Sequence, residues 1–292
     1  MELKEIRDQI FYIEDTTNIG LVELGNEFLL IDAGIDKDKG KKIKKILEEK
    51  GIKPKYLILT HHHADHTGGA RFLKDYFGIT AISSKLEKIF IENPILEPIY
   101  LSLGSSPNKN FLSKWIRSSE VEIDVEAENL NQDSFKNLKI LNLSGHSIGM
   151  IGISLENVVF SSDAFFSKEV LEKYIIPYFH DLEQFENSMK SLISMDYEYI
   201  LPSHGVLYTK SEGDKIIKHN LKHVEEIKDK ILDMISVPRT VEEIFKELQI
   251  TLHDPVVYTL IESSIRAILN YFINRDEANQ FVEKEKLLYK RK

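Results

Sequence analysis

Short apolar segments alternate with amphipathic ones along the first two thirds of the chain. Residues 28–31 and 56–59 are continuous apolar runs, short enough to be buried strands. Between them, residues 36–50 carry Ile43, Ile46 and Leu47 on a charged background, which predicts an amphipathic helix that ends before Gly51. Strands that alternate with helices in this way indicate an α/β fold.

The same alternation continues to about residue 209. Gly78 closes a helix predicted at residues 69–77, and Asp181 with Gln184 forms the capping-box start of another helix. Further strands are predicted at residues 10–13, 20–24, 79–82, 139–143, 150–155, 158–161 and 199–201.

Residues 85–119 break this pattern with repeated Pro and Gly but keep many large apolar side chains. The segment is predicted to be an irregular insertion folded over another surface. We expect four of its side chains to wall a substrate pocket, although they would equally close a side of the fold or a dimer interface. They are Ile99, Tyr100, Phe111 and Trp115.

The strand pattern stops after residue 209, and helices are predicted at residues 215–235, 240–248 and 256–270. This change divides the chain into a catalytic domain, residues 1–210, and a C-terminal helical module, residues 211–292. No apolar run approaches the roughly 18 residues that a membrane helix needs, and residues 1–8 are too charged for a signal peptide. We therefore expect a cytoplasmic protein with no membrane partner.

Composition limits the chemistry of any metal site. The chain has no Cys, so thiolate ligands are excluded and a metal must be held by His and carboxylate side chains. The net charge of −9 argues mildly against a nucleic-acid partner, because neutralising phosphates needs clustered Lys and Arg.

The segment THHHADHTGG directly follows a predicted strand. Six consecutive positions inside it contain four side chains of metal-ligand type. They are His61, His63, Asp65 and His66. Imidazole and carboxylate groups suit zinc, and a dense cluster at a strand end is difficult to explain as surface histidines. His146 in GHS and His204 in PSHG also follow predicted strands. Asp163 ends another strand in SSD, where taken alone it is better explained as a cap.

These four motifs, in this order and approximate spacing, resemble the metallo-β-lactamase superfamily across about residues 1–208. The resemblance implies a four-layer αββα sandwich with a metal site at one edge of the two sheets. It implies that His61, His63 and His146 bind a first metal. It further implies that Asp65, His66 and His204 bind a second metal, that Asp163 bridges both, and that Asp32 supports the ligand loop without binding.

The implied cofactors are two zinc ions, with iron or manganese as alternatives. Two metals about 3.5–4 Å apart can share a hydroxide that is nucleophilic at neutral pH. Asp65 is the predicted catalytic residue, because it is placed to orient that hydroxide or to carry a proton to the leaving group.

Several branches of the superfamily do not fit these residues. The absence of Cys excludes the thiol-ligand β-lactamases, and His63 stands where flavodiiron oxygen reductases carry Glu. The glyoxalase II, lactonase, ribonuclease and generic hydrolase branches remain. Gly-His-Ser-Ile-Gly at residues 145–149 lacks the Pro found in many thioesterase-type members, so the subgroup stays open.

The C-terminal helices resemble the winged-helix-like module of the β-lactamase-like protein 2 group, which includes a single-strand-specific endoribonuclease and acyl-thioester hydrolases. From His219 onward the chain carries 12 Lys and Arg against 13 Asp and Glu, without a basic stripe. We therefore predict hydrolysis of a small ester or thioester, with a ribonuclease or phosphodiesterase as the alternative. A non-catalytic metal-binding protein with the same fold is a third alternative, and a homodimer is compatible with the sequence.

Overall fold

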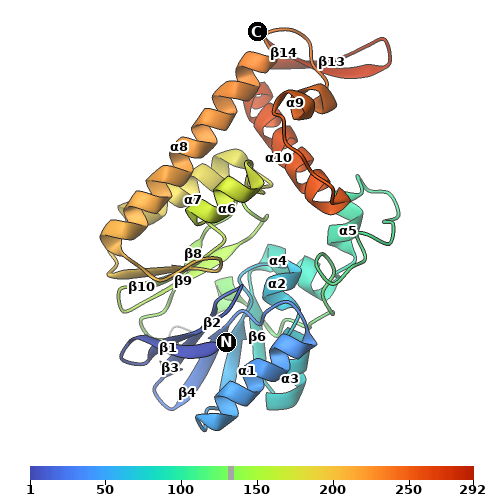
Figure 1. The fold of residues 1–292 in the computed structure, drawn as a ribbon. Coiled ribbons are helices and arrows are strands. Elements are labelled where there is room, and N and C mark those ends of the chain that lie inside the picture. The colour runs from blue at the N-terminus through green and yellow to red at the C-terminus, as the bar shows by residue number, and fades with distance from the viewer. Residues whose placement is uncertain (131–134) are drawn as a thin grey trace.

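Two β-sheets stack face to face, helices cover their outer faces, and a further helical region follows at the C-terminus (Figure 1). The computed structural model describes residues 1–130 and 135–292. Seven strands form the first sheet in chain order, the first four antiparallel and the remaining ones added in parallel. They are β1 (Glu2–Arg7), β2 (Ile10–Glu14), β3 (Ile19–Leu24), β4 (Glu27–Ile31), β5 (Pro54–Ile58), β6 (Thr80–Ser83) and β7 (Val125–Glu126).

The second sheet has five strands in the order β12-β11-β10-β9-β8, and only β10 and β11 pair in parallel. Its strands are β8 (Lys139–Asn142), β9 (Ile151–Leu155), β10 (Val158–Ser162), β11 (Tyr199–Pro202) and β12 (Tyr208–Thr209). The helices before the C-terminal region are α1 (Lys37–Glu49), α2 (Ala64–Thr67), α3 (Ala70–Phe77), α4 (Lys85–Glu92), α5 (Leu96–Leu101), the 3₁₀ turn η1 (Ala127–Asn129), α6 (Lys168–Tyr174) and α7 (Leu182–Ser194).

Three buried cores define the layers. Ile43 of α1 and Leu73 of α3 pack on the outer face of the first sheet. Ile58 and Phe160 lie in a core shared by the two sheets, and α7 covers the outer face of the second sheet through residues such as Phe185. The order is helix, sheet, sheet, helix, so the predicted sandwich is confirmed.

The helix caps follow from the sequence. Asp36 accepts hydrogen bonds from two backbone N–H groups at the start of α1, and Asp181 Oδ1 accepts one from Gln184 N at 3.0 Å. Gly78 closes α3 in the left-handed conformation, with φ of 71°. These helices begin and end within one or two residues of the predicted positions.

The predicted irregular insertion is more ordered than expected. It contains α4 and α5, and Pro98 lies in the first turn of α5, where a missing backbone N–H costs no helical hydrogen bond. The sequence prediction treated Pro94 and Pro98 as breakers. Pro94 does lie between α4 and α5, but Pro98 lies within α5, so the prediction was wrong for Pro98.

The C-terminal region consists of α8 (Lys210–Met234), α9 (Val241–Glu247), α10 (Pro255–Asn274) and a hairpin of β13 (Ala278–Glu283) and β14 (Lys286–Arg291). The helices agree with the sequence prediction, but the expectation that strands stop after residue 209 was wrong. Lys284 and Glu285 form the hairpin turn with φ of 50° and 59°, without the Asn-Gly or Asp-Gly pair that signals such turns.

One described helix, α10, is long and apolar enough to cross a membrane by length and composition alone, with a mean hydropathy of 1.2. The sequence prediction of no such segment was therefore too strong. Ile265, Leu269 and Phe272 of α10 are buried in the largest core, as in a helix that packs inside a folded region.

Candidate metal centre

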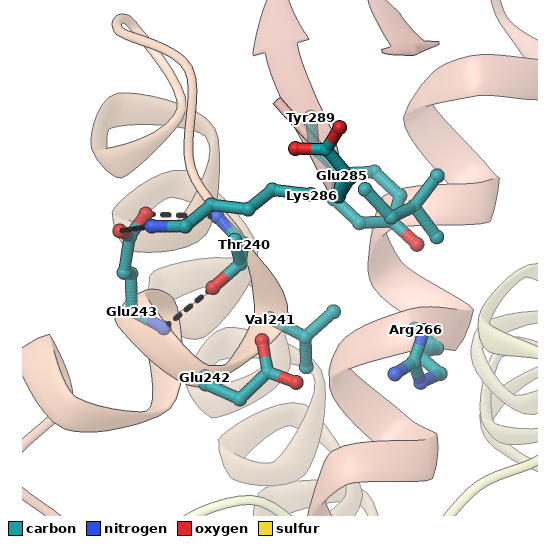
Figure 2. Close-up of a pocket in the computed structure, with 9 residues that line it drawn as sticks. Thr240, Val241, Glu242, Glu243, Arg266, Glu285, Lys286 and Tyr289 are labelled. Atoms are coloured by element: carbon teal, nitrogen blue, oxygen red, sulfur yellow. Dashed lines mark hydrogen bonds and ion pairs between the residues drawn. The ribbon is translucent and has the colours of Figure 1, made fainter. Parts of the chain in front are cut away.

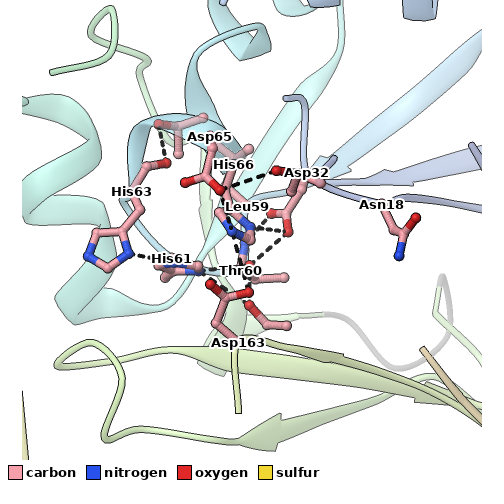
Figure 3. A network of polar contacts seen from close by, with 12 residues as sticks. Asn18, Asp32, Leu59, Thr60, His61, His63, Asp65, His66 and Asp163 are labelled. Carbon is pink, nitrogen blue, oxygen red and sulfur yellow. Dashed lines mark hydrogen bonds and ion pairs between the residues drawn. The ribbon is translucent and has the colours of Figure 1, made fainter. Parts of the chain in front are cut away.

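The loop after β5 supplies four of the predicted ligand side chains. The backbone passes from Thr60 through the histidines into the short helix α2, so that His61, His63, Asp65 and His66 face a common region (Figure 3). Gly68 ends this turn against the β4–α1 loop. A Cβ at Gly68 would lie 1.9 Å from the Ile35 carbonyl oxygen, so only Gly fits there.

The remaining predicted ligands come from three loops of the second sheet. His146 follows β8, Asp163 follows β10 and His204 follows β11. Gly145 has φ of 128°, and a Cβ there would lie 2.1 Å from Phe185 N. Only Gly therefore fits at the position before His146. Loops at the same edge of two stacked sheets thus bring together residues that lie up to 143 positions apart between His61 and His204.

One side of the site consists of three imidazoles. His63 Nδ1 lies 3.0 Å from His61 Nε2 and 2.9 Å from His146 Nε2. These three side chains form a cluster with metal-ligand spacing, which we call the first side.

The other side combines imidazole with carboxylate and is called the second side. His204 Nε2 lies 3.0 Å from Asp65 Oδ2, and His66 Nε2 lies 3.6 Å from the same oxygen. Asp65, His66 and His204 also cluster with metal-ligand spacing.

Asp163 lies between the two sides. Its carboxylate oxygens lie 3.5 Å from His146 Nε2, 3.6 Å from His66 Nε2 and 3.5 Å from His204 Nε2. Among the described residues, His66 Nε2 and Asp163 Oδ1 are buried without a hydrogen-bond partner. Buried polar atoms normally have hydrogen-bond partners. A ring nitrogen and a carboxylate oxygen left without one, among converging His and Asp side chains, fit a bound metal.

Asp32 holds the ligand loop, as the resemblance implied. Its carboxylate accepts from Thr60 N at 2.8 Å and from Thr60 Oγ1 at 2.9 Å, and it lies 2.8 Å from His66 Nδ1. An acceptor on the far nitrogen orients a ligand imidazole.

Sequence reasoning missed the loop between β2 and β3. Thr17 Oγ1 donates to Asp65 Oδ2 at 3.2 Å, and Asn18 Nδ2 donates to the Pro202 and Gly205 carbonyls at 3.0 Å each. This loop ties the second side to the turn that carries His204. Neighbouring Thr and Asn side chains are common in loops, so no local signal distinguishes them.

Glu87 of α4 is a second missed residue. It is fully buried, and it accepts from Ser147 Oγ at 2.6 Å and from Gly149 N at 2.7 Å. Its other oxygen contacts both His62 N and His62 Nδ1. Through Glu87, His62 joins the two ligand loops of the first side.

The insertion also reaches the site. Glu97 of α5 is only 6% exposed, and its carboxylate lies 3.6 Å from His63 Nε2. Burial raises the pKa of Glu97 to about 8. Tyr100 lies one turn further along α5, with its hydroxyl 3.2 Å from His180 Nδ1.

The predicted pocket-wall residues differ in position. Phe111 is buried in a small cluster with Leu101 and Ile116 that packs against α10. Trp115 is 67% exposed and contacts Lys114, whereas Tyr100 is 45% exposed. Their predicted role in a pocket stays a prediction.

The two sides differ in how they hold protons. Burial lowers the pKa of His61, His63 and His146, which favours their neutral form. Burial also opposes charge on His66 and His204, but Asp65, Asp163 and (for His66) Asp32 outweigh it and raise the pKa of both imidazoles.

A separate pocket of about 430 Å³ lies in the C-terminal region, between α9, α10 and the hairpin (Figure 2). Glu242, Glu243 and Glu285 line it together with Arg266 and Lys286. It contains none of the predicted metal ligands, which lie instead at the edge of the two sheets.

Fold and site together define a metallohydrolase of the αββα type. A model of the metallo-β-lactamase superfamily matches residues 12–204, which include all seven predicted ligands. The chain therefore belongs to the metallo-β-lactamase superfamily.

Named relatives share part of the sequence. The chain is 25% identical over 215 residues to a hydroxyacylglutathione hydrolase of Pelagibacter ubique, covering 72% of this chain and 78% of that protein. It is 34% identical over 124 residues to the hydroxyacylglutathione hydrolase GloC of Haemophilus influenzae, covering 41% and 54%. A metallo-β-lactamase family protein of Thermus thermophilus has the same fold, with a TM-score of 0.73, 18% identity, and 100% and 98% coverage.

Proposed function

We propose that this hydrolase cleaves a small thioester and that the seven converging side chains hold two zinc ions. The observation that carries the proposal is the convergence of three imidazoles on one side and of two imidazoles with a carboxylate on the other, with Asp163 between them. The similarity to hydroxyacylglutathione hydrolases supports a thioester. The proposal includes a catalytic domain of residues 1–210, a C-terminal module of residues 211–292 and a cytoplasmic location.

His61, His63 and His146 would hold the first metal, and Asp65, His66 and His204 the second, with Asp163 facing both. When bound, two such metals supply Lewis acidity and a nucleophile at neutral pH. The reaction adds water across the C–S bond and releases a carboxylate and a thiol, without any redox change.

Asp65 is the residue proposed to move a proton. One of its oxygens contacts Thr17 Oγ1 and His204 Nε2, and the side chain is 29% exposed, so it is open to the space beside the site. Burial raises its pKa, but His66 and His204 outweigh that effect and lower the pKa, which favours the ionised carboxylate. The leaving thiolate needs less protonation than an alkoxide would, because thiols have pKa values of about 8.5.

Tyr178 and Phe166 form an aromatic wall beside the site. The Tyr178 ring lies 5.6 Å from the His63 ring and 5.4 Å from the His146 ring, between centroids. Phe166 lies 5.8 Å from the His146 ring. Aromatic walls around polar donors are typical of small-molecule sites.

A substrate panel on metal-quantified protein tests the proposal. We expect close to two zinc equivalents per chain and a higher kcat/KM for acyl thioesters than for lactones, phosphodiesters or single-stranded RNA. Faster cleavage of RNA or a phosphodiester would favour the nuclease alternative. Full metal loading without turnover of any substrate would favour a binding protein that has kept the fold.

A further inference from the structure

Four of the five proposed ligand histidines share one arrangement. In each, one ring nitrogen faces the site and the other lies near an oxygen of the protein. The pairs are His146 Nδ1 with Tyr178 O at 3.0 Å, His66 Nδ1 with Asp32 Oδ2 at 2.8 Å, His204 Nδ1 with Thr16 O at 2.8 Å and His61 Nδ1 with Thr60 Oγ1 at 3.2 Å. Such acceptors fix the tautomer and the ring orientation of a ligand histidine.

His63 is the fifth, and its ring is turned the other way. Its Nδ1 faces His61 Nε2 and His146 Nε2, so Nδ1 is the atom directed at the first side. The outward atom is therefore Nε2. The carboxylate of Glu97 lies 3.6 Å from it, just beyond hydrogen-bond distance.

Glu97 is held in this place by the fold. Leu101, on the same helix, packs with Phe111 and Ile116 against Val256 and Leu260 of α10. The C-terminal region therefore backs the helix that carries Glu97 (Figure 1).

A buried carboxyl group needs a hydrogen-bond partner whether or not it is ionised, because an unpaired buried polar group is costly. Among the described residues, Glu97 pairs with His63, and no Lys or Arg forms an ion pair with it. His62 and His63 also cluster with Glu97 at metal-ligand spacing. However, His62 Nδ1 is already engaged by Glu87, and His63 Nδ1 faces the first side.

We propose that Glu97 is the positioning residue of His63: it accepts a hydrogen bond from Nε2–H and so presents Nδ1 to the first metal. This inference rests on the proposed function, since it takes the first side to be a metal site. It gives the insertion a role in assembling the site in addition to any role in enclosing substrate.

The test compares two substitutions of similar length. Glu97→Met removes the acceptor and keeps the volume, whereas Glu97→Gln retains a carbonyl oxygen that can accept. Glu120→Gln, on an exposed carboxylate just after the insertion, is the matched control. The dissociation constant of each metal is measured by chelator competition with Zn²⁺, and the Co²⁺-substituted protein reports the ligand geometry of the first side by its visible spectrum.

We expect Glu97→Met to weaken the first metal by about 10–100-fold, as losses of such acceptors typically do. Glu97→Gln should weaken it less, the control should match the wild-type protein, and the second metal should change little. The melting temperature of the metal-free variants verifies that they fold.

The assignment would be overturned if Glu97→Met bound the first metal with wild-type affinity, or if both variants lost the same affinity. It would also be overturned if the wild-type protein bound a third metal that Glu97→Met lost, because Glu97 would then be a ligand together with His62 and His63. These results are distinct from failure of the proposed function, because that failure would appear as the absence of tight metal binding in the wild-type protein.

Discussion

The two sides of the candidate metal centre each have three ligand side chains, but the pKa values of their imidazoles shift in opposite directions. The first side is three imidazoles whose pKa values burial lowers, so they are neutral and available to a cation. The second side surrounds His66 and His204 with carboxylates that raise the pKa of both rings. A metal entering the first side meets lone pairs, whereas a metal entering the second side must displace protons.

The difference also concerns support. The first side depends on α4 and α5 through Glu87 and Glu97, which come from the insertion. The second side depends on the β2–β3 loop through Thr17 and Asn18, and on Asp32 after β4. Each side is therefore supported by a different part of the catalytic region, and the Asp163 carboxylate lies close to histidines of both sides.

The largest expected effect is loss of one metal by deletion of a ligand on one side. His61→Ala should remove the first metal and His204→Ala the second, because each leaves the imidazoles of the opposite side in place. Elemental analysis under zinc saturation should find about one equivalent in either variant. If both variants lost both metals, the two sides would have to be treated as a single cooperative unit.

Asp65→Asn should give the next largest effect. Positioned proton transfer contributes about 10²–10⁴-fold in rate, and an amide cannot accept the proton. The loss should be larger for an oxygen ester than for a thioester of the same acyl group, because an alkoxide needs the proton more. Measuring kcat on both substrates with metal content checks this, and unchanged turnover at full occupancy would exclude the proton role.

The third prediction concerns pH and metal affinity. With raised pKa values, His66 and His204 carry protons near neutral pH in the metal-free protein, and the protons compete with the second metal. As the pH falls, affinity should therefore decrease for the second metal before it decreases for the first, whose imidazoles have lowered pKa values. Zinc titrations at about pH 8, 7 and 6 with proton release measured by calorimetry check the order. Equal pH dependence on the two sides would contradict it.

The candidate ligand loops could be located from the sequence because each motif is local. His61 to His66 lie in one turn after a strand, and the residue types alone limit the chemistry. Glu87, Glu97 and Thr17 could not be found in the same way, because their partners lie up to 62 positions away, as from Glu87 to Gly149. An acidic residue on a short helix is usually at the surface, so burial was the missing information.

The fold shows the same distinction between local and distant information. Helices with caps, such as α1, were predicted to within a residue or two, because capping side chains act over three or four positions. The β13–β14 hairpin was missed because its strands are largely polar and its turn is Lys-Glu. Arg239 pairs with Tyr289 of β14 as an isolated bridge, a contact across 50 residues that no local pattern indicates.

The smallest expected effect concerns the part of the insertion that follows Glu97. Tyr100 lies one turn after Glu97 and its hydroxyl contacts His180, whereas Trp115 is 67% exposed and contacts Lys114. If the insertion encloses substrate, Tyr100→Ala should lower kcat/KM by about ten-fold, because losing a small apolar contact to a substrate costs at least about 1 kcal/mol in such pockets. The loss should grow with acyl length.

Trp115→Ala is the matched comparison. An exposed ring contributes little to folding or to a pocket, so this variant should stay close to the wild-type protein in kcat/KM and melting temperature. Metal content should hold in both variants, since neither side chain contacts a proposed ligand. If Tyr100→Ala reduced turnover equally for all acyl lengths in proportion to its melting temperature, Tyr100 would be bracing the fold. Substrate would then be enclosed by residues other than the predicted wall.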